Sequence, residues 1–545
     1  MTERWYSEAI VYCLDVETFQ DSDGDGVGDL PGLIGRLDYL ERLGINCLWL
    51  KPLHPTPGRD DGYDVTDFYG VDPRLGSLGD FTELLQEAAN RGIRVIIDLV
   101  VNHTSDEHPW FRAARSSKDS PYRDWYVWSE TEPPDRFQGM VFPGPQRETW
   151  TFDEEAGAWY YHRFHEFQPD LNFANPEVRA EIKKIIGFWL RLGLSGFRVD
   201  AAPFIIELTQ PGNPNSPKDF EFLTELREHA SWLRGDSVFL AEANVEPAKL
   251  VEYFCDAGGS ANRLHMLFDF MLNGRLVLGL ARHDAEPIID ALRDTPILPA
   301  AAQWATFLRN HDEIDLSRLT TEQRNDVLAV FAPEENMQLY GRGIRRRLAS
   351  MLENDRRRIQ LAYSLQFTLR GTPVLRYGEE IGMGDDLSLP DRNAIRTPMQ
   401  WSAAANGGFS TAPRERLVRP AISGGEYGYE RVNIITERQE PGSLLNWFER
   451  MIRTLRECPE VGTGSCTVVD VEVPRHVLVH RAESGGRSVL FLHNLADTDV
   501  TLDLSGVAGD GAEPVGVFAD QAYRPVDGKL AEAELRGYGY RWIRL

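Results

Sequence analysis

Short apolar runs alternate with amphipathic segments along most of the chain. In the amphipathic segments, such as residues 78–92 and 175–193, apolar side chains recur every three or four positions, which predicts helices. Asn175 is a favoured N-cap residue and Pro176 suits the first helical turn, so the second helix has a defined start. The apolar runs have the length of buried strands, and they cover residues 10–16, 46–50, 94–101, 196–201, 238–243, 264–270, 305–310 and 372–378.

Eight apolar strands that alternate with helices predict an α/β fold, specifically a (β/α)8 TIM barrel. A doubly wound open sheet is the alternative, but no G-x-G-x-x-G loop follows any of these strands. Two connections are too long to be simple loops. Residues 104–175 are rich in aromatic residues and prolines, and we interpret them as a small domain inserted after the third strand. Residues 311–354 form a second long excursion, after the seventh strand.

The pattern changes near residue 460. A last amphipathic helix at 443–458 is followed by runs with a period of two, such as HVLVHRA and SVLFLHNLA, which predict antiparallel strands. The predicted organisation is a barrel whose first part covers 1–103, a small inserted domain at 104–175, the remainder of the barrel at 176–460, and a C-terminal antiparallel β-sandwich domain at 461–545.

Composition narrows the class of protein. The chain has 545 residues, of which 42% are hydrophobic and 26% charged, an ordinary globular balance. Its net charge of −26 would repel a phosphate polymer, so we expect no nucleic-acid partner. The five cysteines are odd in number and scattered, which argues against a disulfide framework and favours a reducing, cytoplasmic location. Without a run of about 18 apolar residues, and with a polar start, we expect neither a membrane span nor a signal peptide.

Polar side chains follow four of the predicted strands at their C-terminal ends, where the loops of a TIM barrel build the active site. A charged residue in an apolar strand is costly unless it is paired or functional. A structural ion pair would explain any one of them, but the combination at one barrel mouth predicts an active site. The residues concerned are Asp98, Asn102, His103, Arg198, Asp200, Glu242, His311 and Asp312.

Convergent carboxylates without a metal-ligand pattern suit glycoside chemistry. One carboxylate attacks the anomeric carbon, and a second, held protonated by its surroundings, gives a proton to the leaving oxygen. Arg198 precedes Asp200 by two positions on the same strand, so the two side chains face the same side. The arginine can therefore hold that aspartate ionised by charge and hydrogen bonding.

Four segments, DLVVNHTS, GFRVDAAP, FLAEAN and FLRNHDE, resemble in order and spacing the four motif regions of the α-amylase family, glycoside hydrolase family 13. QPDLN at 168–172 is similar to a further motif at the end of that family's inserted domain. The resemblance spans essentially the whole chain. It implies that Asp200 is the nucleophile, that Glu242 is the general acid/base, and that Asp312 is a third carboxylate that stabilises the transition state.

The resemblance also implies a set of substrate-binding residues. Asp60 and Tyr63 in RDDGYD match an end-of-chain pocket, where a tyrosine stacks on the sugar ring and an aspartate takes its hydroxyls. Arg396 in RTPMQWS matches an arginine that partners the same aspartate in exo-acting members. The positions that hydrogen-bond the sugar next to the cleaved bond are matched by His103, Arg198 and His311.

Longer stretches, among them RDDGYD, WYYHRFHEFQPDLN and GIRRRL, are most similar to family members that isomerise maltose to trehalose. Those enzymes retain the freed glucose in a closed pocket, where it turns and attacks the glucosyl-enzyme. The resemblance therefore implies a retaining enzyme acting on a small disaccharide, with the inserted domain and residues 311–354 closing the pocket and the arginines of GIRRRL anchoring the closure. Closure serves to exclude water.

Two alternatives stay open. The segments AEANVEP and MQLYGRGIRRR, which neighbour the acceptor side, depart from the expected pattern, so an exo-acting α-glucosidase or a transglucosylase with another acceptor is the runner-up. A catalytically inactive binding protein is a different class, and the three intact carboxylates argue against it. The sequence leaves the oligomeric state open, a homo-oligomer included, and implies no organic cofactor.

The loop DSDGDGVGD at 21–29 begins like an EF-hand calcium loop. It follows a strand instead of a helix, and its twelfth position is Gly32 instead of glutamate, so it is not an EF-hand. In exo-acting members of the family a similar loop binds one structural Ca²⁺. The resemblance implies oxygen ligands, which suit Ca²⁺ better than Mg²⁺, from Asp21, Asp23, Asp25, Asp29 and the carbonyl of Val27, and a second ion near Asn102 and Asp170 is a weaker inference.

Overall fold

The computed structural model describes residues 4–142, 144–213, 215–508, 513–525 and 530–545. Its centre is a closed barrel of eight parallel strands, in which β1 pairs with both β2 and β14 and so closes the ring. All eight predicted strands are present. In chain order they are β1 (Val11–Leu14), β2 (Cys47–Leu50), β3 (Arg94–Leu99), β7 (Gly196–Val199), β8 (Val238–Ala241), β9 (Met266–Phe268), β10 (Gln303–Phe307) and β14 (Thr372–Arg376).

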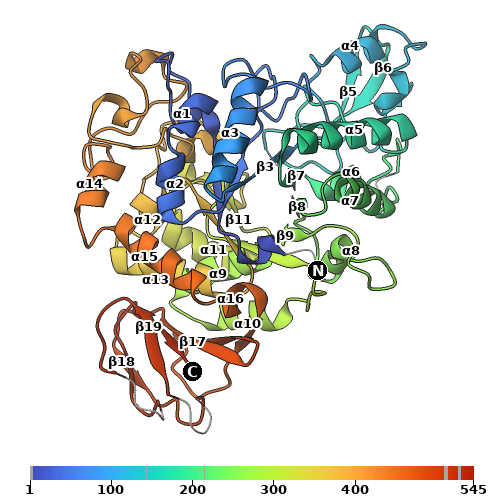
Figure 1. The fold of residues 1–545 in the computed structure, drawn as a ribbon. Helices are drawn as coiled ribbons and strands as arrows, with labels where there is room; N and C mark the ends of the chain where they lie inside the picture. The colour runs from blue at the N-terminus through green and yellow to red at the C-terminus, as the bar shows by residue number, and fades with distance from the viewer. Residues whose placement is uncertain (1–3, 143, 214, 509–512, 526–529) are drawn as a thin grey trace.

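Helices cover the outside of the barrel (Figure 1). Helix α5 (Pro176–Leu192) begins as predicted, because the Asn175 side chain accepts a hydrogen bond from the backbone of Glu177. It ends at Gly193, whose left-handed φ of 112° favours glycine. The other covering helices include α2 (Leu37–Leu43), α3 (Leu78–Asn90), α7 (Glu221–Leu233), α8 (Pro247–Phe254), α9 (Phe270–Arg282), α10 (Glu286–Asp294), α13 (Arg356–Thr368) and α15 (Leu444–Arg456).

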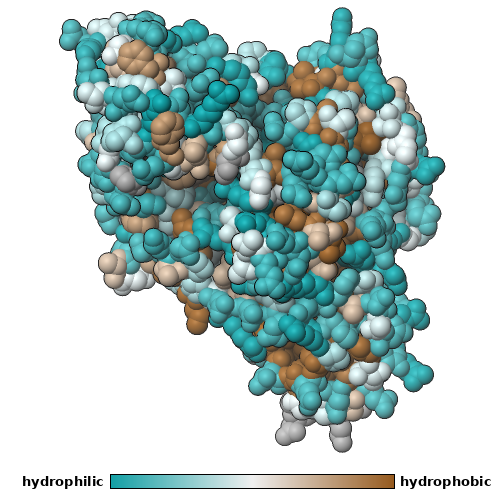
Figure 2. Space-filling view, turned by 180° about the vertical axis from the view of Figure 1, so that it is seen from behind, coloured by the Kyte–Doolittle hydropathy of each residue, from teal (hydrophilic) through white to brown (hydrophobic). Residues whose placement is uncertain are grey.

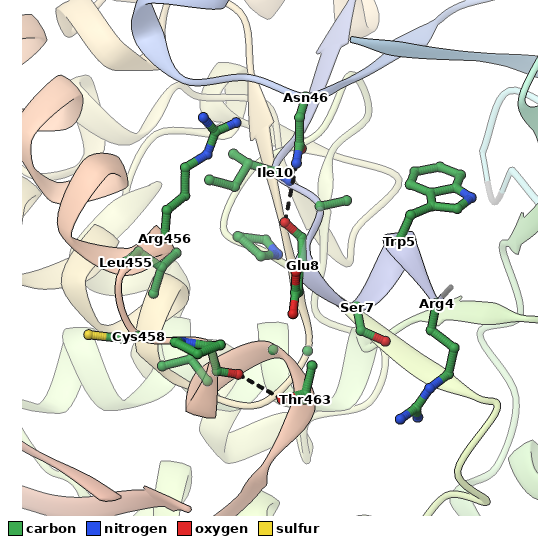
Figure 3. A pocket seen from close by; sticks show the side chains of 16 residues that line it. Arg4, Trp5, Ser7, Glu8, Ile10, Asn46, Leu455, Arg456, Cys458 and Thr463 are labelled. Atoms are coloured by element: carbon green, nitrogen blue, oxygen red, sulfur yellow. Dashed lines mark hydrogen bonds between the residues drawn. The ribbon is translucent and has the colours of Figure 1, made fainter. Parts of the chain in front are cut away.

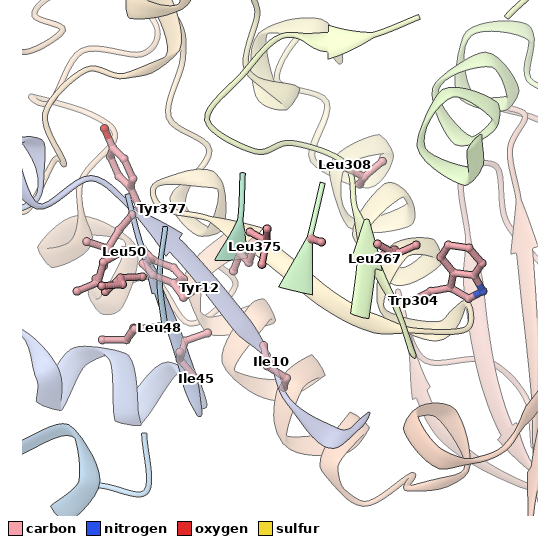
Figure 4. Close-up of a cluster of buried hydrophobic side chains, with 14 of the residues drawn as sticks. Ile10, Tyr12, Ile45, Leu48, Leu50, Leu267, Trp304, Leu308, Leu375 and Tyr377 are labelled. Atoms are coloured by element: carbon pink, nitrogen blue, oxygen red, sulfur yellow. The ribbon is translucent and has the colours of Figure 1, made fainter. Parts of the chain in front are cut away.

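The alternation of side chains along each strand divides the core in two. On β1, Val11 and Cys13 point into the barrel and join a cluster with Trp49 and Phe268. Tyr12, between them, belongs to the larger cluster under the helices, part of which Figure 4 shows. Both faces of every barrel strand are therefore buried, which explains why these strands are continuous apolar runs.

The inserted segment carries helix α4 (Pro109–Ser116) and a sheet in the order β4-β6-β5, made of β4 (Trp128–Ser129), β5 (Trp150–Asp153) and β6 (Ala158–Tyr161). Figure 1 shows it at the upper right, above the barrel. The second excursion forms a small sheet in the order β11-β13-β12, with β11 (Ile314–Asp315), β12 (Gln338–Leu339) and β13 (Gly343–Ile344).

The C-terminal domain lies below the barrel (Figure 1) and consists of antiparallel strands. Its five-stranded sheet, in the order β15-β16-β17-β21-β19, shares an apolar cluster with the pair β18-β20. The bounds are β15 (Ser465–Val468), β16 (Val477–Ser484), β17 (Arg487–Asn494), β18 (Val500–Leu502), β19 (Val515–Ala519), β20 (Ala533–Leu535) and β21 (Tyr540–Arg544). The exact domain boundaries proposed above stay predictions.

The face shown in Figure 2 is mainly hydrophilic, as the net charge of −26 leads one to expect, and its apolar side chains form separate patches. Among the described residues, every helix is too short or too polar to cross a membrane.

Candidate active site

The three predicted catalytic carboxylates line one cavity of about 520 Å³ at the C-terminal ends of the barrel strands. Asp200 directly follows β7, Glu242 directly follows β8, and Asp312 lies in the loop after β10. Backbone hydrogen bonds from Asp200 to Leu99 and from Glu242 to Val199 continue the barrel pairing just past the strand ends. Asp200 and Glu242 are therefore placed by the barrel strands themselves, whereas Asp312 is placed by the loop after β10.

Arg198 joins two of these carboxylates from inside the barrel. Its Nη1 lies 2.5 Å from Asp200 Oδ1, and its Nη2 donates to Glu242 Oε2. The same Nη1 lies 3.5 Å from Asp98, which is buried and also accepts hydrogen bonds from Trp49 and Tyr63, each at 2.8 Å. One guanidinium thus contacts both predicted reacting carboxylates and holds them side by side.

The surroundings separate the protonation behaviour of the three carboxylates. Burial raises the pKa of Glu242 to about 7, and the Asp200 and Asp312 charges add to this, while Arg198 opposes it. Burial also raises the pKa of Asp200, against the opposing Arg198. The pKa of Asp312 is lowered instead. Burial opposes ionisation of this carboxyl, but Arg392, His311 and Arg396 hold its pKa well below its usual range. Glu242 is therefore the carboxylate best suited to carry a proton near neutral pH.

Tyr63, His103 and Asp60 line the same cavity. The Tyr63 hydroxyl lies 2.8 Å from His311 Nε2, and the two rings are stacked. His103 Nε2 lies 3.0 Å from the Tyr63 carbonyl oxygen, and burial lowers the pKa of this histidine to about 4. Asp60 accepts a hydrogen bond of 2.8 Å from Gln168 of the QPDLN motif, and burial raises its pKa to about 7.

The predicted pairing of Arg396 with Asp60 is wrong. Arg396 donates to the neighbouring residue, Asp61, and its Nη2 lies 2.9 Å from Asp312 Oδ1. Asp61 has a left-handed φ of 47°, and its side chain pairs with Arg396 and Arg419, whereas the Asp60 side chain pairs with Gln168. Arg198, His311 and Arg396 are not among the side chains found to line the cavity; each contacts a lining residue from behind.

Sequence reasoning missed Arg392. It lines the cavity, and its guanidinium lies 3.0 Å from Asp312 and 2.7 Å from Glu313. The sequence did contain one indication, because Arg392 lies in the segment PDRNAIRT, four positions before the predicted site residue Arg396. It was missed because an arginine in a loop has no periodic pattern that sets it apart.

Two excursions meet over the cavity. The Phe142 and Tyr340 rings are 5.1 Å apart, and Arg342 Nη2 donates to the Val141 carbonyl at 3.0 Å. Directly after β13, Arg345 of GIRRRL donates to the carbonyls of Asn336, Leu387 and Asp391. The inserted domain and the 311–354 excursion therefore contact each other across the mouth.

The acidic loop after β1 brings together some of the predicted metal ligands. Carboxylate oxygens of Asp21, Asp23 and Asp29 lie within 4.8 Å of one another. Asp25 is exposed and lies outside this group. Two buried carboxylates and one exposed carboxylate, all oxygen donors, fit a hard divalent cation such as Ca²⁺.

A second cavity, of about 590 Å³, lies at the opposite end of the barrel, beside β1 and the helix before the C-terminal domain (Figure 3). Its lining includes Arg4, Glu8, Arg456 and Cys458 and none of the predicted site residues. Asn46, also in its lining, is engaged by the backbone of Ile10 and Glu8. The predicted chemistry is confined to the other end of the barrel.

Comparison with known proteins gives the same family as the motifs. Residues 15–463 match the model of the α-amylase catalytic domain, and residues 466–542 match the maltogenic amylase C-terminal domain. The fold and site define a barrel enzyme with glycoside chemistry, and the chain belongs to the α-amylase family.

Similar proteins include a trehalose synthase of Thermus thermophilus, 43% identical over 97% of this chain and 54% of its own length, so the chain spans about half of that relative. A protein named trehalose synthase/amylase from Mycolicibacterium smegmatis is 40% identical over 99% of this chain and 93% of its own. The crystal structure of an α-amylase from H. orenii aligns with a TM-score of 0.79 at 28% identity, covering 98% of this chain and 99% of that one.

Proposed function

We propose that the chain is a retaining α-glucoside enzyme that interconverts maltose and trehalose within one closed site. The observation that carries the proposal is the pair Asp200 and Glu242 on a single guanidinium, in a cavity large enough for a disaccharide. Two relatives that the chain matches over more than nine-tenths of their own length are named trehalose synthases, which supports trehalose as one of the two sugars.

The proposed reaction has two displacements. An Asp200 oxygen attacks the anomeric carbon of the donor glucose while Glu242 gives its proton to the leaving oxygen, which frees the second glucose. That glucose turns, its own anomeric hydroxyl attacks the glucosyl-enzyme, and the proton returns to Glu242. Two inversions restore the α configuration. Asp312, held ionised by Arg392 and Arg396, stabilises the positive charge of each transition state.

Isomerisation needs the freed glucose to stay and water to stay out. The contact between Phe142 and Tyr340 and the hydrogen bond from Arg342 to Val141 join the two excursions at the cavity mouth, where they narrow the way out. We propose that these contacts retain the glucose.

The second candidate is an exo-acting α-glucosidase or transglucosylase. It is favoured by the acceptor side, where Arg318 donates to the side chain of Asn244 at 2.6 Å and to Glu246 at 2.7 Å, in a segment that departs from the isomerase pattern. A relative named oligo-1,6-glucosidase, 32% identical over 92% of the chain, is a glucosidase by name and supports this candidate.

Incubation with maltose, followed by NMR of the products, separates the two. The isomerase gives trehalose as the main product and little glucose. If glucose is the only product, with two molecules formed for each maltose consumed, the enzyme is an α-glucosidase and the isomerase proposal is refuted. Asp200→Asn should abolish turnover in either case, and wild-type turnover in this variant would refute the assignment of the nucleophile.

We also propose that the loop at 21–29 binds one Ca²⁺ through Asp21, Asp23 and Asp29, supported by the convergence of their oxygens. A cytoplasmic location remains our proposal as well; the five cysteines are free thiols, four of them buried, which suits a reducing compartment.

A further inference from the structure

Arg419 is a buried arginine outside every motif discussed above. It lies in the loop between η8 (Arg414–Arg416) and α14 (Ile434–Gln439), and only 7% of its surface is exposed. Each of its nitrogens has a partner. Nη2 donates to Asp61 Oδ1, Nη1 to Glu17 Oε1 at 2.7 Å, and Nε to Asn393 Oδ1 at 2.9 Å.

These contacts extend a row of alternating charges into the active site. The second oxygen of Asp61 accepts a hydrogen bond from Arg396 Nη1, and Arg396 Nη2 reaches Asp312 at 2.9 Å. From the cavity wall outward the row is therefore Asp312, Arg396, Asp61, Arg419 and Glu17. It ends at a separate cavity of about 310 Å³, whose lining includes Glu17, Asp61 and Arg419.

Burial makes the balance of this row important. Charges interact more strongly in a poorly hydrated interior, and a buried charge that loses its partner is strongly unfavourable. Asp61 is shared between two guanidinium groups, and Arg396 is shared between two carboxylates. If Arg419 is removed, Asp61 is left with excess negative charge and draws Arg396 toward itself, away from Asp312.

We propose that Arg419 is a positioning residue for the donor end of the site. Arg419 neutralises part of the negative charge of Asp61. It thereby keeps Arg396 shared between Asp61 and Asp312, and it holds the left-handed turn next to Asp60. Arg419 is not part of the lining of the catalytic cavity, and it acts through Asp61 and Arg396. The inference rests on the proposed function, because it assumes that Asp312 stabilises the transition state.

The test uses release of p-nitrophenol from p-nitrophenyl α-glucoside, which needs bond cleavage but no particular acceptor. Arg419→Leu should lower kcat about tenfold with a smaller change in KM, because Arg396 acts on Asp312 in the transition state. Arg419→Lys should recover part of the loss. The double variant Arg419→Leu/Asp61→Asn, which removes one charge of each sign, should be faster than Arg419→Leu alone.

Arg416→Leu is the matched control, since this arginine is exposed in the same part of the chain and should leave kcat unchanged. Circular dichroism and the Tm establish that each variant folds. An Arg419→Leu variant with wild-type kcat, or a loss that neither the lysine nor the double variant relieves, would overturn the positioning role. A folded wild-type chain that cleaves no α-glucoside would instead overturn the proposed function and this inference with it.

Discussion

The pKa of Glu242 predicts how the activity of the enzyme depends on pH. Burial and the charges of Asp200 and Asp312 raise this pKa to about 7. The first step needs the protonated form, so kcat/KM for maltose should fall as the pH rises through about 7. Glu242→Gln should lower kcat/KM by at least about 100-fold and abolish this alkaline limb. The measurement is the pH profile of kcat/KM for both proteins.

The substrate supplies the control for this prediction. p-Nitrophenol leaves without help from a proton, so formation of the glucosyl-enzyme from p-nitrophenyl α-glucoside should suffer far less in Glu242→Gln than the reaction with maltose. An alkaline limb that persists unchanged in the variant would assign it to another group. Because Glu242 and Asp200 share Arg198, the observed value belongs to the coupled set of carboxylates.

Sequence and structure agree at the residues whose position a strand determines. Asp200 and Glu242 each follow an apolar run directly, so their place at the barrel mouth could be predicted. Asp61, Arg392 and Arg419 could not, because their partners come from distant loops. The choice between Asp60 and Asp61 for Arg396 depends on the left-handed backbone at Asp61, which a sequence with two adjacent aspartates does not reveal.

Whole elements also differ in how far the sequence predicts them. Barrel strands are buried on both faces, so they appear in the sequence as continuous apolar runs with clear limits. The contact between the two excursions at the cavity mouth leaves no such pattern in the sequence. Val141 and Arg342 lie 201 positions apart, and the contact depends on how two irregular excursions fold back over the barrel. This contact therefore could not be predicted from the sequence and is seen only in the structure.

The acidic loop after β1 carries a prediction at this scale. If it binds Ca²⁺, removal of the ion with EGTA should lower the Tm by roughly 2–4 °C, because an ion that binds the folded state stabilises it. Asp23→Asn should lower the Tm in calcium and remove most of the response to EGTA. Asp23 is the appropriate target, because Asp29 also caps α1 (Leu30–Ile34) through the backbone of Gly32 and would destabilise the helix when changed.

Asp38→Asn, on the exposed face of α2, serves as the control and should keep the full response to EGTA. A wild-type Tm that is the same in calcium and in EGTA would refute the proposed ion. An equal response in wild type and Asp23→Asn would place the ion elsewhere in the protein.

At the scale of the whole molecule, the C-terminal domain packs on the barrel through two buried histidines. His493 Nε2 lies 2.9 Å from Ser364 Oγ, and His480 Nε2 lies 3.2 Å from the Thr368 carbonyl, both on α13. The two imidazole rings stack 5.4 Å apart, and Trp542 also donates to Ser364 at 2.9 Å. Protonating either ring would therefore place a charge in a closed interface that contains no carboxylate among these contacts.

Acid should weaken this interface in a defined range of pH. Burial lowers the pKa of His480 from 6.5 to about 4, so the unfolded chain binds this proton more readily than the folded one. The contribution of His480 to the free energy of unfolding is complete above about pH 6.5 and is lost as the pH falls toward 4, a change of up to about 3 kcal/mol. His480→Gln, which retains a donor for Thr368 but does not titrate, should flatten the decline of stability measured by urea unfolding between these values. His476→Gln, just before β16, leaves both stacked rings in place and should keep the wild-type slope. An equal slope in His480→Gln and wild type would show that the acid sensitivity arises outside this contact, since the buried imidazole is the group that the substitution removes.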